Sequence, residues 1–180
     1  MSATTAGPAI FQIDNAHTSV EFVARHLMIA KVRGRFGTVA GSITLGESGN
    51  LPSQVEVTIQ TGSIDTGEPQ RDGHLKSDDF LNAEKYPTIT FKSTKIAGSE
   101  ESFTMTGDLT IRDVTKTVDL KGELAGRVKD PWGNDRLAYA AEGEINRKDF
   151  GASWNQALET GGVVVGDKVK IEIAVQAIRA

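Results

Sequence analysis

The chain contains no cysteine, which excludes a disulfide framework, a thiolate nucleophile and a cysteine-ligated metal site. Aromatic residues are scarce, at 6% of 180 residues, whereas 19 glycines and 5 prolines favour many short turns. The formal net charge is −4 and no segment concentrates lysine and arginine, so we expect no nucleic-acid partner. No window is apolar over the length that a membrane-spanning helix needs. With 38% hydrophobic and 24% charged residues, the composition fits one globular domain.

The first residues differ in character from the remainder of the chain. Residues 1–9 are mostly small and predict a flexible tail, followed by a single domain over residues 10–180. The tail has neither the basic segment nor the apolar run of a secretory signal peptide. We therefore expect a cytoplasmic protein from the sequence as it stands, and a cleaved leader preceding this sequence stays open.

Apolar and polar residues alternate with period two along most of the domain. The alternation is clear over residues 20–25, 55–60, 103–112, 118–124, 139–145 and 169–176, and weaker over 31–46 and 86–97. Such alternation gives each strand one dry and one wet face, which is typical of antiparallel sheets. Turn-forming clusters at 46–52, 98–100 and 130–135 separate the strands.

These patterns predict an all-β fold, an antiparallel barrel of about eight strands with one or two short helices. Closure into a barrel removes the exposed edges that amphipathic strands would otherwise leave. Two stretches, 62–85 and 148–166, have no strand pattern. Within the first, residues 70–81 predict a short helix that covers one end of the barrel.

Several predicted strands carry glycine on the dry face. Glycine within a strand either lets the strand coil or marks the close approach of a ligand to the backbone. The five glycines favour an elongated apolar cavity over a filled core, because their neighbours on the same face are apolar. They are Gly34, Gly107, Gly122, Gly126 and Gly143.

Few residues are candidates for chemistry. The three histidines, His17, His26 and His74, lack the spacing of a metal site, so no metal site is predicted. His26 is in phase with the apolar residues of its strand, as Arg147 is with those of its own, so both are expected to point inward near strand ends. Each could either contact a ligand head group or hydrogen-bond to groups that seal the barrel end. Beside His74, we expect the charged residues of the short helix to tie down a loop by local pairing.

The candidate ligand-binding residues are the inward-facing positions, the two strand-end residues and two aromatic residues of the second irregular stretch. For Phe150 and Trp154, capping of the cavity and ordinary loop packing are both open. No catalytic residue and no cofactor is predicted. The candidate set is Phe22, His26, Phe36, Val57, Ile59, Phe91, Met105, Leu109, Leu120, Gly122, Leu124, Tyr139, Gly143, Ile145, Arg147, Phe150, Trp154 and Ile171.

An ordered set of motifs runs through residues 11–178. The motifs are Ile13-Asp14-x-x-His17-Thr18-Ser19-Val20-x-Phe22, His26-Leu27, Gly34-x-Phe36, Gly41, Ser63-Ile64-x-Thr66, Arg71-Asp72-x-His74-Leu75, Asp79-Phe80, Tyr86-Pro87-x-Ile89-x-Phe91, Gly107-Asp108-Leu109-Thr110-Ile111, Arg147-x-Asp149-Phe150-Gly151 and Val165-Gly166-Asp167-x-Val169. With these motifs the chain resembles the YceI-like family of polyisoprenoid-binding proteins. The resemblance implies a lipocalin-like barrel and a non-enzymatic carrier or store of long isoprenoid chains, including quinone-type lipids. Many members of the family have a periplasmic leader, a pattern that residues 1–9 do not show.

A carrier of this kind is expected to exchange its lipid with membranes, and a homodimer is left open. Two alternatives to a carrier also stay open. An isomerase or cyclase acting on an enclosed lipid would need a general base near the reactive atom, and His26 is the only good candidate. An interaction protein would have a filled barrel and use its outer surface.

Overall fold

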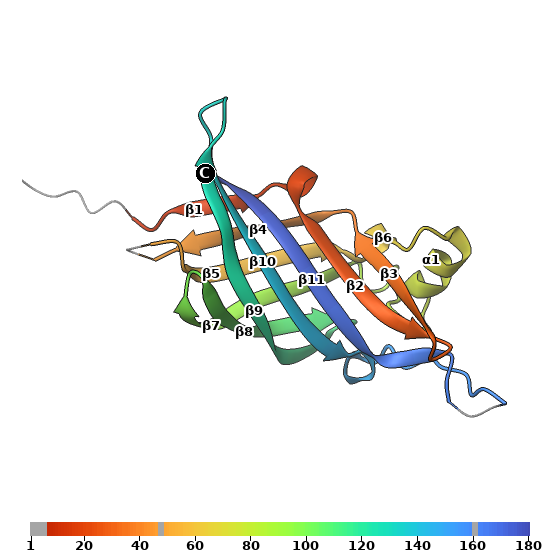
Figure 1. The fold of residues 1–180 in the computed structure, drawn as a ribbon. Coiled ribbons are helices and arrows are strands. Elements are labelled where there is room, and N and C mark those ends of the chain that lie inside the picture. Colours follow the sequence, from red (N-terminus) through yellow and green to blue (C-terminus); the bar gives the residue numbers. More distant parts are fainter. Residues whose placement is uncertain (1–6, 47–48, 160–161) are drawn as a thin grey trace, which may run out of the picture.

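The computed structural model describes residues 7–46, 49–159 and 162–180, which form one sheet of eleven strands with one α-helix and three short 3₁₀ helices (Figure 1). The strands are β1 (Ile10–Ile13), β2 (Ser19–His26), β3 (Ala30–Phe36), β4 (Val39–Leu45), β5 (Pro52–Gln60), β6 (Ile64–Asp65), β7 (Thr88–Ser99), β8 (Ser102–Ile111), β9 (Val114–Lys129), β10 (Asp135–Asn146) and β11 (Val165–Arg179). The helices are α1 (Pro69–Lys76), η1 (Asn15–His17), η2 (Thr61–Ser63) and η3 (Arg147–Phe150).

Eight of the strands close into an antiparallel barrel, which confirms the predicted fold class. Their order is β1-β4-β5-β7-β8-β9-β10-β11, and β1 pairs in turn with β11. The long strand β11 borders two strands, because residues 177–179 pair with β1 and residues 165–174 pair with β2. The sheet continues from β2 through β3 to β6, and these three strands extend the wall at one end of the barrel.

The predicted turn over 130–135 joins β9 to β10, and Asp130 organises it. Its carboxylate accepts hydrogen bonds from the backbone N–H groups of Trp132 and Asn134, each at 2.9 Å. The Nε atom of Arg136 donates to the same carboxylate at 2.7 Å. Aspartate favours turns because its short side chain satisfies nearby backbone donors in this way.

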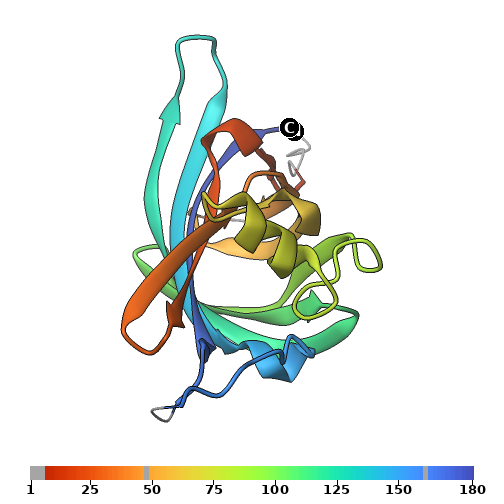
Figure 2. The same ribbon diagram turned by 90° about the vertical axis from the view of Figure 1, so that its right-hand side faces the viewer.

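α1 lies across one end of the barrel, as the sequence predicts (Figure 2). The helix ends at Lys76, earlier than predicted, because the N–H and the hydroxyl of Ser77 both donate to the His74 carbonyl. Arg71 and Asp72 hold the helix to the preceding loop through Thr66, whose hydroxyl donates to Asp72 and accepts from Arg71. The charged residues of the helix thus tie down a loop by local pairing, as the sequence predicts.

The end of the barrel formed around β1 is filled. Phe11, Leu45, Leu137 and Ala177 are at most 2% exposed and pack in the core cluster. Of the predicted tail over residues 1–9, residues 1–6 lie outside the described part, and residues 7–9 precede β1. Within the described residues, no helix is long and apolar enough to cross a membrane.

Candidate ligand-binding site

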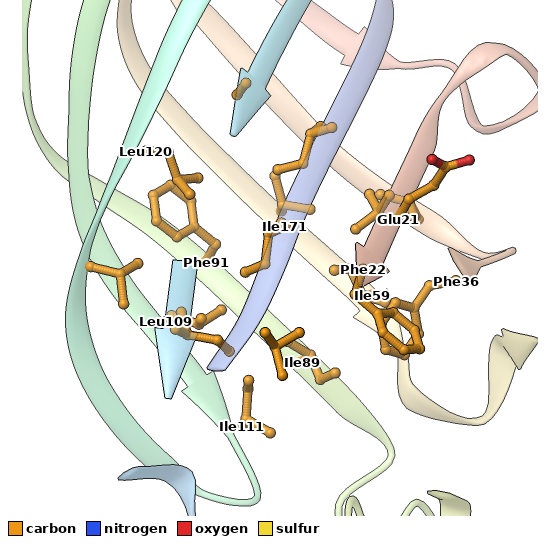
Figure 3. A pocket seen from close by; sticks show the side chains of 18 of the residues that line it. Glu21, Phe22, Phe36, Ile59, Ile89, Phe91, Leu109, Ile111, Leu120 and Ile171 are labelled. Atoms are coloured by element: carbon orange, nitrogen blue, oxygen red, sulfur yellow. The ribbon is translucent and has the colours of Figure 1, made fainter. Parts of the chain in front are cut away.

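The barrel encloses a cavity of about 250 Å³ (Figure 3). Its walls come from strands on all sides of the barrel, and α1 with the loop after it contributes at one end. Most lining side chains are aliphatic or phenylalanine, because each strand turns its apolar face inward. The predicted residues that line the cavity are Phe22, Phe36, Val57, Ile59, Phe91, Met105, Leu109, Leu120, Tyr139, Ile145, Arg147, Phe150 and Ile171.

Gly122 and Gly143 do not line the cavity, contrary to the prediction. The ring of Phe103 covers Gly122, and a Cβ atom built there would overlap Cε2 and Cζ of that ring. A Cβ at Gly143 would lie 2.5 Å from Cδ2 of Leu120. At both glycines, a large side chain from the adjacent strand therefore fills the space that a side chain of the glycine position would occupy.

Replacing Gly122 with alanine should lower the free energy of unfolding by about 1–3 kcal/mol, because Phe103 is buried and must move. Gly126 lies on the same strand, and a Cβ added to it would have no atom within 4 Å, so it provides the control. Gly126→Ala should change stability by less than about 1 kcal/mol. Urea unfolding monitored by circular dichroism measures both values, and equal effects of the two substitutions would contradict this role of Gly122.

His26 is exposed and lies outside the cavity lining, so its predicted inward position is wrong. It is the last residue of β2, directly before the turn into β3, and pairs with Ala30 on one side and Val165 on the other. By alternation, His26 lies on the same face of β2 as Phe22 and Ala24. At the end of the strand, however, this face no longer borders the enclosed interior.

Leu124 and Trp154 also lie outside the lining set. Leu124 is half-buried and packs against the core cluster. The ring of Trp154 packs edge-on against His74, with 4.7 Å between centroids, and lies 5.6 Å from that of Phe80. Because Phe80 itself lines the cavity, Trp154 stands behind it as a second layer of the cap at the α1 end.

Sequence reasoning missed the residues that close the α1 end. Leu75, Phe80 and Leu81 line the cavity from α1 and the loop after it, where no period-two pattern identifies an inward face. Ile89 also lines it and could have been found, because it is in phase with Phe91 on β7.

The polar residues that line the cavity turn their polar atoms away from it. The hydroxyl of Tyr139 donates to the Asn50 carbonyl, and burial raises the pKa of this phenol. The hydroxyl of Thr18 donates to the carbonyl of Asp14 at 2.7 Å. Glu21 lies with its carboxylate directed outward, 3.7 Å from Arg33. An occupant of the cavity therefore meets almost only carbon.

Arg147 is buried, and its guanidinium fastens the loop that follows η3. Its nitrogen atoms donate to four carbonyl groups, those of Ala152 at 2.6 Å, Gly166 at 2.8 Å, Trp154 at 2.9 Å and Val165 at 3.2 Å. Burial lowers the pKa of this arginine, and Asp167, 3.8 Å away, partly offsets the shift. Of the two predicted alternatives for Arg147, the structure favours a seal of the barrel end, because every one of these donors is engaged by the protein.

Neither a cluster of metal ligands nor a histidine faces the cavity in the described part of the chain. No group of three or more potential metal ligands occurs among the described residues. His17 contacts Asp14 at 2.8 Å and His74 contacts Asp79 at 2.8 Å, and none of the three histidines lines the cavity.

Comparison with known proteins identifies similar chains across almost the whole length. The family model of the YceI-like domain matches residues 11–177. Protein YceI of Escherichia coli O157:H7 is 42% identical over 151 residues, covering 83% of this chain and 79% of that protein. The Campylobacter jejuni YCEI crystal structure superposes with a TM-score of 0.75 at 32% identity, covering 87% of this chain and 90% of that one. A polyisoprenoid binding domain from Saccharophagus degradans, implicated in plant cell wall breakdown, has the same fold, with a TM-score of 0.68, 14% identity and coverage of 94% and 98%.

Proposed function

This chain belongs to the YceI-like family, and we propose that it binds and carries a long apolar lipid of the isoprenoid type inside its barrel. The observation that carries the proposal is the interior, an apolar cavity whose few polar lining residues are paired with other protein groups. Such an interior penalises a polar occupant, because no group compensates for its desolvation. It stabilises a hydrocarbon by about 0.8 kcal/mol for each buried methylene. The polyisoprenoid-binding neighbour supports an isoprenoid as the class of lipid.

The cavity volume limits how much of a chain the observed conformation holds. A volume of about 250 Å³ is slightly below the roughly 300–1,000 Å³ of pockets that enclose a drug-sized ligand. A long isoprenoid would therefore extend past the α1 end, where Leu75 and Leu81 come from a helix and a loop and not from the hydrogen-bonded wall. The filled β1 end leaves no comparable route.

The side chains that line the cavity support binding without catalysis. A lipid isomerase or cyclase needs a general base within hydrogen-bonding reach of the enclosed substrate. His26, the candidate for that role, is exposed outside the cavity, and the only carboxylate residue in the lining, Glu21, faces Arg33 on the outside. The alternative of an interaction protein with a filled barrel is not supported, because this barrel contains a cavity.

Organic extraction of the purified protein, followed by mass spectrometry, tests this function. We expect about one equivalent of a long-chain isoprenoid or related apolar lipid per protein after expression in a host that makes such lipids. The same extraction from a filled β-barrel protein purified in parallel controls for adhering lipid. Absence of a stoichiometric apolar compound from several hosts would contradict the proposal, and so would conversion of the extracted lipid on incubation with the protein.

A further inference from the structure

The turn between β2 and β3 exposes three consecutive large apolar side chains. Leu27 is 39% exposed, Met28 57% and Ile29 84%. A single exposed apolar residue is ordinary on a protein surface, but a contiguous group at the tip of a hairpin indicates contact with an apolar partner. The tip is held in place, because the N–H of Leu27 donates to the Val164 carbonyl at 2.8 Å.

The backbone of this turn is unfavourable for the residues that occupy it. Leu27 and Met28 have φ angles of 53° and 63°, and the N–H of Ile29 bonds to the His26 carbonyl at 3.3 Å, which together describe a type I′ turn. Asn-Gly is the preferred pair in such turns, since large side chains crowd the backbone in the left-handed region. Large apolar side chains are unfavourable here both for the turn conformation and for contact with water, so they do not stabilise the fold. Such local conflicts are typical of functional positions.

Two cations, Arg25 and Lys31, lie beside the apolar tip on the outer face of the same hairpin, opposite each other in the pairing of β2 with β3. Arg35 lies farther from the tip on β3, opposite Glu21 of β2 and Asp65 of β6. These three side chains are exposed and form no ion pair with any residue in the described ranges, whereas Arg33 pairs with Glu172 at 3.0 Å. Since the chain has a net charge of −4, the hairpin is a local basic region on an acidic protein.

We propose that the β2–β3 hairpin docks this protein on an anionic lipid bilayer. Residues 27–29 would enter the interface while Arg25 and Lys31 meet the lipid phosphates, the combination that holds amphipathic elements on membranes. The tip lies at the α1 end of the barrel (Figure 1), and Phe22 and Ala24 of the same strand line the cavity. This docking role rests on the proposed function. Docking at the tip would bring the α1 end of the cavity to the membrane with which the protein would exchange its lipid.

A second hairpin exposes an apolar residue at the opposite end of the molecule. Trp132, in the turn between β9 and β10, is 81% exposed. This hairpin lies far from α1 (Figure 1). Its two carboxylates, Asp130 and Asp135, are paired with Arg136 and Arg127, each at 2.7 Å. Among the described residues, this turn therefore lacks the group of cations without ion pairs that the β2–β3 hairpin has. Its distance from the α1 end makes this hairpin a matched control.

Sedimentation with vesicles tests the docking surface. The full chain is mixed with vesicles of equal parts phosphatidylglycerol and phosphatidylcholine, or of phosphatidylcholine alone, at low and physiological ionic strength. We expect partitioning onto the anionic vesicles that salt weakens. Ile29→Asp should weaken it about tenfold or more, and Lys31→Glu about fivefold or more. Trp132→Ser and Lys129→Glu, at the other hairpin, should leave it within about twofold of wild type.

A further variant separates docking from folding. Leu27→Asn with Met28→Gly introduces the pair that suits a type I′ turn, so its thermal midpoint should equal or exceed that of wild type while its vesicle binding falls. No binding by wild type, binding unaffected by Ile29→Asp, or binding abolished by Trp132→Ser would overturn the proposal. So would capture of the tip by a protein partner with no vesicle binding. Because sedimentation does not depend on cargo, docking can hold while extraction finds no lipid, or fail while it finds one.

Discussion

Replacing Arg147 with methionine should lower the free energy of unfolding by about 3–4 kcal/mol. The substitution leaves the carbonyl groups of Ala152, Trp154 and Gly166 without the donor that Arg147 supplies, and each unsatisfied buried polar group costs about 1–3 kcal/mol. The Val165 carbonyl still accepts from the side chain of Asn155 at 2.7 Å. Removal of a desolvated charge offsets part of this loss. The measurement is urea unfolding of both proteins, with amide hydrogen exchange to show that the segment between η3 and β11 opens first.

Lys148→Met is the matched control for this prediction. Lys148 is the neighbouring residue and pairs with Asp167 at 3.2 Å, but its side chain is 46% exposed. Exposed ion pairs contribute about 0–1 kcal/mol, so this variant should stay within about 1 kcal/mol of wild type. A similar loss in both variants, or an unchanged Arg147→Met protein, would mean that the guanidinium does not hold the cap.

The barrel and most of its lining could be predicted from the sequence because strand geometry is periodic. In a strand, alternate residues face the same side, so one inward residue identifies the others without knowledge of the neighbours. Met105 and Leu109 on β8, and Tyr139 and Ile145 on β10, all line the cavity for this reason. The same rule failed for His26, because it does not indicate where the enclosing wall ends.

The filling of the barrel could not be predicted in the same way. Whether a glycine faces empty space depends on the residue placed opposite by the register between strands, and register is not encoded in either strand alone. Gly122 faces Phe103 across the β8–β9 pair, so the glycine accommodates a ring and opens no space. The cap formed by Leu75, Phe80 and Leu81 depends on long-range packing of irregular segments, which have no period to analyse.

Replacing Ile171 with tryptophan should abolish most cargo binding while the barrel still folds. Ile171 points into the cavity from β11 (Figure 3), and the larger side chain occupies part of its volume of about 250 Å³. Each methylene displaced from the interior loses about 0.8 kcal/mol. Displacement of two or three therefore weakens binding about tenfold or more. Overpacking costs about 1–3 kcal/mol, so strand content by circular dichroism should persist.

Lys170→Trp separates occlusion of the cavity from a general effect of tryptophan on β11. Lys170 is the preceding residue on the same strand, its side chain is 51% exposed, and it faces outward toward Glu172 and Glu142. This variant should retain the cargo of wild type, measured as extracted lipid per folded protein by mass spectrometry. Equal lipid content in Ile171→Trp and Lys170→Trp would place the lipid outside the barrel, since an occupant of this cavity cannot share it with an indole ring.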